Sequence, residues 1–347
     1  MAFAYDVENR TKESAARVVL SWLWTVAIEL GVWVSAIWSR ASRPAHPLSS
    51  SPANAEAFGP YTLGEKIGEG GMGVVYKARQ AGQQRPAAIK LLPFDRAEGR
   101  NGERFEREFQ LTRKLSHPNT ISVYDFGRTP EGSLYYAMEY LEGADLQKLV
   151  DRTGPQPPAR VAHLLAQICD ALVEAHGAGL LHRDIKPANV FLCERSDARD
   201  TVKVLDFGLI KEFGPRAGHP AQTDVDSVVG TPTYLSPEAI TAPETMDGRS
   251  DLYAVGALGY FLLTGAPPFL GKTVLEICAR HLHCAPVPPS ARAAVPAELE
   301  RLIMSCLAKS PAARPRDAAS LRAALLPLAA QWTGDSDIEV ASVREAA

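Results

Sequence analysis

The chain carries two successive patterns of apolar positions. Between residues 61 and 140, short runs rich in β-branched and aromatic residues dominate, which is typical of strands. The expected strands are residues 61–66, 74–78, 87–92, 120–126 and 134–140, and one stretch of helical spacing, residues 103–115, interrupts them. The pattern therefore predicts a small sheet-rich half that contains one helix.

Beyond residue 140, apolar residues recur at intervals of three and four, which indicates helices that bury one face. The expected helices are residues 160–179, 252–264, 273–283, 298–307 and 317–330, with one strand at residues 202–205. The predicted fold class is α+β, with the small half at residues 61–140 and a larger, mainly helical half at residues 141–330.

The segment before this folded region is apolar, but its relation to a membrane is ambiguous. After a leader of residues 1–17, residues 18–38 contain no Lys or Arg, yet Glu29 lies near their centre and makes insertion into a bilayer marginal. A membrane helix and a peripheral or partner-packing helix both stay open. Residues 39–60 are rich in Pro, Ser and Ala and are expected to be a flexible linker, and residues 331–347 a polar, disordered tail.

Composition narrows the functional classes. A chain with 46% hydrophobic and 22% charged residues is globular, and a net charge of -3 without a basic run predicts no nucleic-acid partner. The five cysteines are odd in number and lack Cys-x-x-Cys spacing, so no disulfide framework is indicated and a cytoplasmic location is favoured.

Four residues of metal-ligating type lie close together near the end of the helix expected at residues 273–283. A helix end followed by prolines spreads such side chains, and a histidine there usually lies at the surface or caps the helix, so no zinc site is predicted. The four residues are Cys278, His281, His283 and Cys284.

Three glycines, Gly68, Gly70 and Gly73, form Gly-x-Gly-x-x-Gly between two expected strands. A dinucleotide-binding turn uses the same glycines but precedes a helix, whereas a hairpin favours a lid over nucleotide phosphates. A glycine hairpin without a ligand is the alternative.

Lys90 follows the apolar residues 87–89 and would bring an ammonium group to the same phosphates. Glu108 in the expected helix is the favoured ion-pair partner, and Glu103 and Glu106 are the competing ones.

Residues 182–189, His-Arg-Asp-Ile-Lys-Pro-Ala-Asn, form a loop because Pro187 prevents the preceding helix from continuing. Asp184 can accept a hydroxyl proton, Lys186 can neutralise phosphoryl charge, and Asn189 can offer an amide oxygen to Mg²⁺.

Asp206, Phe207 and Gly208 end the strand at residues 202–205. This position allows Asp206 to bind Mg²⁺ beside Asn189, while Phe207 packs inward.

Together these motifs, in this order over residues 61–328, resemble the protein kinase superfamily. The bacterial eukaryotic-like Ser/Thr kinases look most similar, through Arg-Phe-Glu-Arg-Glu at 104–108, His-Pro-Asn at 117–119 and Gly-Thr-Pro-Thr-Tyr-Leu-Ser-Pro-Glu at 230–238. Ser236 replaces the commoner Ala of the last motif. The resemblance implies a two-lobed kinase domain at residues 61–330, with a small antiparallel-sheet N-lobe (61–140) and a larger helical C-lobe (141–330).

The resemblance also implies a Ser/Thr protein kinase that uses ATP with Mg²⁺, or Mn²⁺, on protein substrates. It assigns Asp184 and Lys186 with the Lys90–Glu108 ion pair to catalysis, and Asn189 and Asp206 to the metal. The implied ATP-binding residues are Ile67, Gly68, Gly70, Gly73, Val75, Ala88, Lys90, Glu139 and Leu141, with Met138 as gatekeeper.

Two structural pairs are implied as well. Glu238 is expected to pair with Arg314, and Asp251 to support the backbone at residues 182–183.

Regulation is expected to involve Arg183, because a guanidinium before the catalytic Asp can bind a phosphate on the activation segment. Thr223 and Ser227 are the candidate phosphosites, and Asp224 and Asp226 offer a constitutive negative charge instead. A catalytically silent pseudokinase scaffold and a small-molecule phosphotransferase are the alternative functions. The sequence leaves a homodimer open.

Overall fold

The computed structural model describes residues 57–70, 73–82, 85–92, 109–129, 133–194, 200–207 and 232–332. The chain divides into two units, Met1–Asn54 and Ala55–Ala347, and all described residues belong to the second. The segment at residues 18–38 therefore lies outside the described residues. Among the helices that are described, none is long and apolar enough to cross a membrane.

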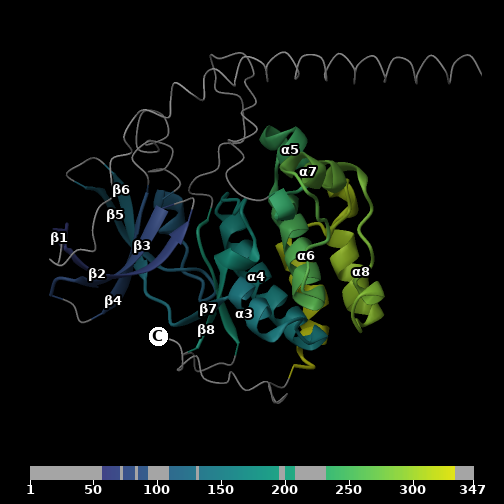
Figure 1. Cartoon of the computed structure of the whole chain (residues 1–347), viewed down its shortest axis with the longest axis horizontal. Coiled ribbons are helices and arrows are strands. Elements are labelled where there is room, and N and C mark those ends of the chain that lie inside the picture. The colour runs from purple at the N-terminus through teal and green to yellow at the C-terminus, as the bar shows by residue number, and fades with distance from the viewer. Residues whose placement is uncertain are drawn as a thin grey trace, which may run out of the picture. The chain divides into compact units, whose positions relative to one another are not determined.

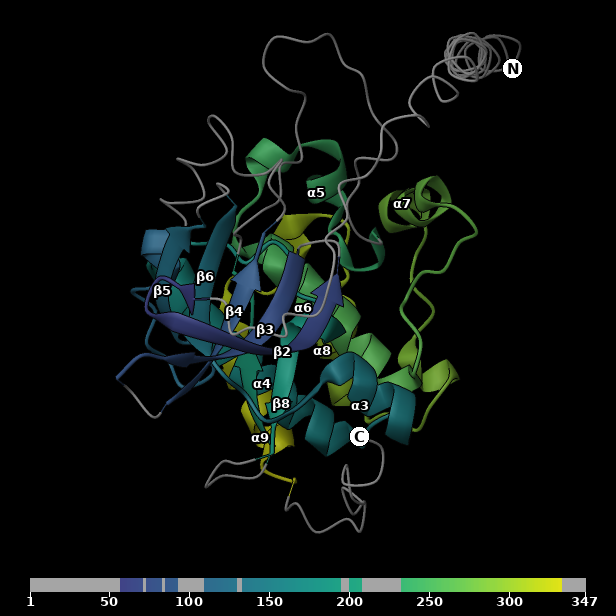
Figure 2. The same ribbon diagram turned by 60° about the vertical axis from the view of Figure 1, so that its left-hand side comes forward.

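The N-lobe is an antiparallel sheet with strand order β1-β2-β3-β4-β6-β5 (Figures 1 and 2). Its strands are β1 (Ala57–Phe58), β2 (Tyr61–Gly70), β3 (Gly73–Gln80), β4 (Pro86–Leu91), β5 (Val123–Arg128) and β6 (Leu134–Glu139). The five strands predicted from the sequence are confirmed, with shifted ends. β1 lies within the expected linker, so the folded region begins before Tyr61.

β5 begins at Val123 rather than at residue 120 because residues 119–121 bond to the other lobe. The amide of Ile121 donates to the carbonyl of Val204 at 3.0 Å, and the amide of Val204 donates to the carbonyl of Asn119 at 2.8 Å. These backbone bonds join the segment before β5 to the strand that leads to Asp206.

Two small apolar clusters cover opposite faces of the N-lobe sheet, because successive residues of a strand point to opposite sides. Tyr136 packs with Phe109 and Leu134 on one face, and Tyr135 packs with Tyr61 and Ile89 on the other. Residues 109–112 form the described part of the helix predicted at 103–115. Glu108 lies outside the described residues.

The C-lobe contains a three-stranded sheet, in the order β7-β8-β9, and the larger set of helices. The strands are β7 (Gly143–Asp145), β8 (Val190–Cys193) and β9 (Thr201–Val204). The helices are α3 (Leu146–Thr153), α4 (Pro158–Gly177), α5 (Pro237–Thr241), α6 (Gly248–Thr264), α7 (Val274–His283), α8 (Ala297–Cys306) and α9 (Ala318–Ala329). The five predicted helices are confirmed, whereas the short elements α3, α5, β7 and β8 were not predicted.

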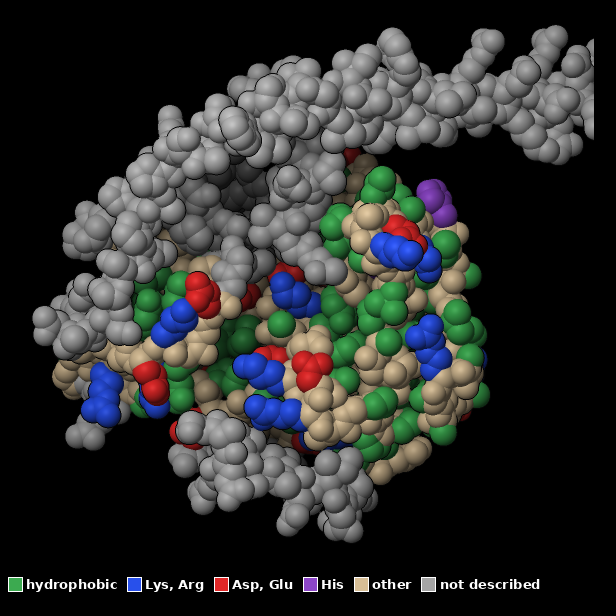
Figure 3. Space-filling view, in the orientation of Figure 1, with side chains coloured by type: hydrophobic (Ala, Val, Ile, Leu, Met, Phe, Trp, Pro, Cys, Tyr) green, Lys and Arg blue, Asp and Glu red, His purple; other side chains and the backbone are tan. Residues whose placement is uncertain are grey.

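Helix α6 is the centre of the C-lobe, and every residue from Ser250 to Leu263 is buried. It begins at Gly248, ahead of the predicted start at residue 252, because the carboxylate of Asp247 accepts a hydrogen bond from the amide of Arg249 at 2.9 Å and caps a polar first turn. Helices α4, α8 and α9 contribute to the same apolar core. On the face drawn in Figure 3, acidic and basic side chains lie interspersed over the described surface.

The C-terminal boundary extends past the predicted residue 330. The guanidinium of Arg160 lies 5.5 Å from the ring centre of Trp332, within cation–π distance, and makes hydrogen bonds of 2.9 and 2.6 Å with the carboxylate of Asp200. Trp332 therefore packs against the start of α4 as part of the folded lobe.

Candidate active site

Helix α6 supports the loop between α4 and β8 through the side chain of Asp251. The amides of His182 and Arg183 donate to the two oxygens of the Asp251 carboxylate, at 2.9 and 2.8 Å, which confirms the support predicted for this backbone. Arg183 adopts φ +64°, a left-handed conformation that non-glycine residues seldom take. The carboxylate of Asp251 thus fixes a strained turn directly before Asp184.

Asp251 remains ionised although it is buried. Burial alone would raise its pKa, but the hydrogen bond and charge of His176, whose Nε2 lies 2.8 Å from Oδ2, lower the pKa below its ordinary value. The anion therefore stays available to both backbone donors.

His182 ties the loop to the strand end that carries Asp206. Its Nε2 lies 2.8 Å from the carbonyl of Leu205, and its Nδ1 lies 3.2 Å from the amide of Asp184. A carbonyl only accepts and an amide only donates, so these contacts assign the neutral ring with the proton on Nε2. Burial lowers the pKa of His182, in agreement with the neutral form.

Asp184, Lys186 and Asn189 form a compact polar group. The ammonium of Lys186 lies 2.9 Å from Oδ2 of Asp184. The amide nitrogen of Asn189 donates to the same oxygen and to the carbonyl of Asp184, both at 2.9 Å. This arrangement presents a carboxylate beside a cation, which suits proton acceptance next to a developing negative charge.

Asp206 follows Leu205, whose amide bonds to the carbonyl of Asn189, and its carboxylate receives two donors from the N-lobe sheet. Lys90 Nζ on β4 lies 2.5 Å from Oδ2, and the hydroxyl of Tyr136 on β6 donates to Oδ1. Burial would raise the pKa of Asp206, but the charge of Lys90 and the hydrogen bonds from Lys90 and Tyr136 outweigh it and hold the pKa below its usual value. Phe207 is fully buried, as predicted, with its ring 4.7 Å from that of His182.

Lys90 is itself 7% exposed and faces Val75 on β3 and Tyr136 on β6 in the sheet register. The partner predicted for it, Glu108, lies outside the described residues. Among the residues that are described, Asp206 forms an ion pair with Lys90. The sheet thus delivers an ammonium group to the carboxylate at the end of the strand before Phe207.

The glycine motif forms the end of the β2–β3 hairpin, with Gly68 opposite Val75 and Gly70 opposite Gly73. Gly73 adopts φ +126°, and a Cβ atom at this position would lie 1.9 Å from the carbonyl oxygen of Leu91. Only glycine allows this close approach of the two backbones. Ile67, before the first glycine, is 42% exposed.

The chain between the two lobes carries Glu139, whose side chain is held on two sides. Its Oε1 accepts the amide of Ser122 at 2.7 Å and the ammonium of Lys203 on β9 at 2.6 Å. Met138 and Leu141 on either side pack against the apolar cluster of the N-lobe. Ala88, the next predicted residue of this region, is buried opposite Met138 in the register of β4 and β6.

Asn189 and Asp206 provide a donor set that fits Mg²⁺. The amide nitrogen of Asn189 is used by Asp184, which leaves the amide oxygen as its acceptor, and Asp206 is an ionised carboxylate. The two residues lie on neighbouring segments, since the amide of Leu205 donates to the carbonyl of Asn189 at 2.9 Å. Oxygen donors in small number match a cation that keeps water and phosphate oxygens as its other ligands.

A pocket opens beside Asp184 toward the segment that follows residue 231. Its lining comes from the loop at residues 182–189, from this segment and from α5 and α6: Arg183, Asp184, Ile185, Lys186, Tyr234, Leu235, Ser236, Ala239, Met246, Ser250, Asp251 and Ala254. A side chain presented to Asp184 could place its neighbour in this pocket.

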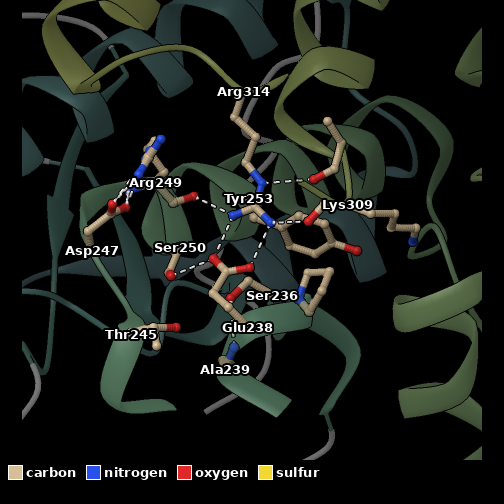
Figure 4. A network of polar contacts seen from close by, with 12 residues as sticks. Ser236, Glu238, Ala239, Thr245, Asp247, Arg249, Ser250, Tyr253, Lys309 and Arg314 are labelled. Carbon is tan, nitrogen blue, oxygen red and sulfur yellow. Dashed lines mark hydrogen bonds and ion pairs between the residues drawn. The ribbon is translucent and has the colours of Figure 1, made fainter. Parts of the chain in front are cut away.

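The segment that lines the pocket is fixed to the C-lobe by Glu238 (Figure 4). Arg314 donates to both carboxylate oxygens of Glu238, at 2.6 and 2.7 Å, and the hydroxyl of Ser250 donates to Oε1 at 2.6 Å. Burial would raise the pKa of Glu238, but these hydrogen bonds lower it. The predicted pairing of Glu238 with Arg314 is confirmed.

Sequence reasoning missed three contacts around this site. Tyr136 and Lys203 carried no motif signal. The register of β4 and β6 places Tyr136 beside Lys90, and the backbone bonds between residues 119–121 and Val204 bring β9 close to Glu139. The predicted phosphosites, Thr223 and Ser227, lie outside the described residues.

The third miss lies in α7: His281 was expected at the surface or as a helix cap. The expectation is wrong, because His281 is fully buried with Nδ1 2.8 Å from the hydroxyl of Tyr253. The other residues of that cluster are not turned the same way: Cys278 is partly exposed, while His283 and Cys284 are exposed. Within the described ranges, no group of three or more His, Cys, Asp or Glu side chains is placed to hold a metal ion.

Comparison with known proteins gives consistent results. Residues 61–324 match the family model described as a protein kinase domain. Serine/threonine-protein kinase pkn3 of Myxococcus xanthus is 42% identical over 269 residues, covering 76% of this chain and 49% of that protein. PknB of Mycolicibacterium smegmatis is 41% identical over 271 residues, covering 77% and 42% respectively. The chain therefore spans about half, or less, of the length of these curated relatives.

Solved structures agree with the fold. The crystal structure of the Mycobacterium tuberculosis PknI kinase domain has a TM-score of 0.64 at 28% identity and covers 80% of this chain and 100% of that one. A crystal structure of Rad53 in complex with AMP-PNP has a TM-score of 0.64 at 26% identity and covers 78% of this chain and 65% of that one.

Proposed function

The chain belongs to the protein kinase domain family, and from this premise we propose that it is a serine/threonine protein kinase. It transfers the γ-phosphoryl group of ATP to hydroxyl groups of proteins. The single observation that carries the proposal is the meeting of Asp184, Lys186 and Asn189 on one loop, opposite the Lys90–Asp206 pair. The named serine/threonine kinases among its relatives support the choice of acceptor.

The residues divide the reaction between them. The oxygen of the acceptor hydroxyl bonds to the γ-phosphorus, the bond from that phosphorus to the bridging oxygen breaks, and Asp184 takes the hydroxyl proton. Lys186, 2.9 Å from Asp184, stabilises the charge on the transferred group. The pocket beside Asp184, lined by Lys186, Tyr234 and Leu235 among others, marks the side from which we expect a protein hydroxyl to approach.

The nucleotide is assigned to the other side of the site. The glycine hairpin, with Ile67 and Val75, covers the phosphates and the base, while Ala88, Glu139 and Leu141 border the base. Asn189 and Asp206 would hold Mg²⁺, or Mn²⁺, which when bound offsets the negative charge of the phosphate oxygens. The AMP-PNP named in the Rad53 complex supports a nucleotide-binding role for this chain.

The polar residues that phosphoryl transfer requires are present together, which disfavours a catalytically silent pseudokinase scaffold. Lys90, Asp184, Asn189 and Asp206 are present and make mutual contacts, so the loop is built for transfer and not only for binding. We extend the proposal to autophosphorylation in the activation segment, at Thr223 or Ser227, which would give Arg183 a phosphate ligand.

The test is transfer of labelled γ-phosphate from Mg·ATP by the full chain, with phosphosite mapping, beside Asp184→Asn. Asp247→Asn, an exposed capping carboxylate in the same lobe, is the matched control. Label at Thr223 or Ser227 that is lost only in Asp184→Asn is the expected result. ATP binding without transfer to the chain or to a general protein acceptor would favour the scaffold.

A further inference from the structure

The carboxylate of Asp206 is held at both oxygens by side chains from two neighbouring strands. Lys90 Nζ lies 2.5 Å from Oδ2, and the hydroxyl of Tyr136 donates to Oδ1. Lys90 and Tyr136 face each other directly in the register of β4 and β6. The proposed reaction has a use for Lys90 at the phosphates, but none of its steps uses Tyr136.

The hydroxyl of Tyr136 is not needed to fill space. The side chain is 2% exposed and packs with Phe109 and Leu134 in an apolar cluster, where a phenylalanine ring would fit as well. A buried hydroxyl lowers stability unless it is hydrogen-bonded, and the bond to Asp206 satisfies it. The position of this hydroxyl is therefore tied to the carboxylate of Asp206.

The backbone of Asp206 is fixed on both sides. The amide of Leu205 bonds to the carbonyl of Asn189 at 2.9 Å, Asp206 has φ +55°, and Phe207 is fully buried. The freedom that remains at Asp206 is rotation of its side chain. The hydrogen bond from Tyr136 restricts that rotation independently of Lys90.

We propose that Tyr136 is a positioning residue for the divalent cation, because it holds Oδ1 of Asp206 and so fixes the orientation of the carboxylate that would bind the cation together with Asn189. When Lys90 turns from Oδ2 to the nucleotide phosphates, Tyr136 still donates to Oδ1. The carboxylate of Asp206 is therefore already oriented when the cation binds. This inference rests on the proposed function, in which Asp206 is a metal ligand.

The size of the effect follows from metal sites in general. Carboxylates that bind a metal are themselves hydrogen-bonded, and loss of such a partner typically lowers metal affinity about 10–100-fold. Removal of the Tyr136 hydroxyl should therefore raise the concentration of Mg²⁺ that the site requires.

The experiment measures ATP binding to the full chain by calorimetry across a series of Mg²⁺ concentrations and in the presence of a chelator. Tyr136→Phe is compared with Tyr135→Phe, which removes a hydroxyl from a 5% exposed tyrosine of the same strand on the opposite face of the sheet. In Tyr136→Phe, the Mg²⁺ concentration for half-maximal enhancement of ATP binding should rise about tenfold or more. ATP affinity in the chelator should stay unchanged, and Tyr135→Phe should behave like the natural chain.

Two results would overturn the inference alone. One is an unchanged Mg²⁺ requirement in Tyr136→Phe, and the other is an equal loss of ATP affinity with and without Mg²⁺, which would assign the hydroxyl to support of the whole pocket. Failure of the natural chain to bind ATP at any Mg²⁺ concentration would instead overturn the proposed function, and this inference with it.

Discussion

Arg314 and Glu238 meet through two parallel hydrogen bonds, from Nη1 to Oε1 at 2.6 Å and from Nη2 to Oε2 at 2.7 Å. The Arg314 side chain is 0% exposed and that of Glu238 11% exposed, so the pair is removed from water. Arg314 also donates to the carbonyls of Arg249, Ala308 and Lys309 (Figure 4). One side chain thus joins the pocket-lining segment to the start of α6 and to the loop before α9.

Arg314→Met should therefore lower the free energy of unfolding by about 3–5 kcal/mol, because it leaves a buried carboxylate without its cation. Urea unfolding followed by circular dichroism measures the change. Arg316→Met, whose side chain is 86% exposed, is the control and should stay close to the natural chain. Equal stability of the two variants would show that Glu238 does not depend on Arg314.

Lys90→Met should abolish phosphoryl transfer. It should also change how the free energy of unfolding depends on pH. In the natural chain the pKa of Asp206 is lowered, so its ion pair contributes stability above the ordinary aspartate pKa and loses it as the pH falls. Without Lys90, burial dominates and disfavours the anion of Asp206. The decrease in unfolding free energy caused by Lys90→Met should therefore be largest at pH 7 and smaller toward pH 4. Urea unfolding at several pH values tests this.

A second variant separates charge from packing in that experiment. Lys90→Met combined with Asp206→Asn removes both charges and should be more stable at pH 7 than Lys90→Met alone. If the double variant is no more stable, the destabilisation comes from lost packing of the Lys90 side chain.

The order of the motifs was enough to predict the two lobes and the loop that carries Asp184. Alternating and helical periodicities located the long elements, and the resemblance supplied the pairs made by Glu238 and Asp251, which the hydrogen bonds confirm. Both pairs bridge residues far apart in sequence, so only knowledge of the family could suggest them.

What could not be predicted depends on tertiary register. Tyr136 meets Asp206 because β4 and β6 align Lys90 with Tyr136, and no local pattern encodes that alignment. His281 follows the helical periodicity of α7, but its burial is decided by the rings of Tyr253 and Phe269, which α7 packs against. Thr120 and Ile121 have strand-forming composition, yet their backbone pairs with Val204, before Asp206, and not with the N-lobe sheet.

Lys203→Met tests the contact that fixes the chain between the lobes. Lys203 and Glu139 are each 16% exposed and lie 2.6 Å apart, so loss of this charged hydrogen bond should cost about 1.5–3 kcal/mol of stability. A double-mutant cycle with Glu139→Gln isolates the pair, and a coupling energy near zero would contradict the prediction. Lys66→Met, which disrupts an exposed pair with Glu69, is the control and should change stability little.

The buried ring of His281 predicts a stability change between pH 6.5 and pH 4. Burial, with the nearby charge of Lys309, lowers the pKa of His281 to about 4, whereas the unfolded chain has the ordinary value near 6.5. Between these values the unfolded chain binds the proton more readily, so the free energy of unfolding should fall as the pH drops, by on the order of 3 kcal/mol from this residue. Above pH 6.5 its contribution should be constant.

His281→Gln cannot titrate, so the difference in unfolding free energy between it and the natural chain should shrink or reverse as the pH falls from 6.5 to 4. His283→Gln, at an exposed position of the same helix, should keep the pH dependence of the natural chain. A pH profile of His281→Gln that runs parallel to that of the natural chain would show that His281 takes up its proton equally in both states.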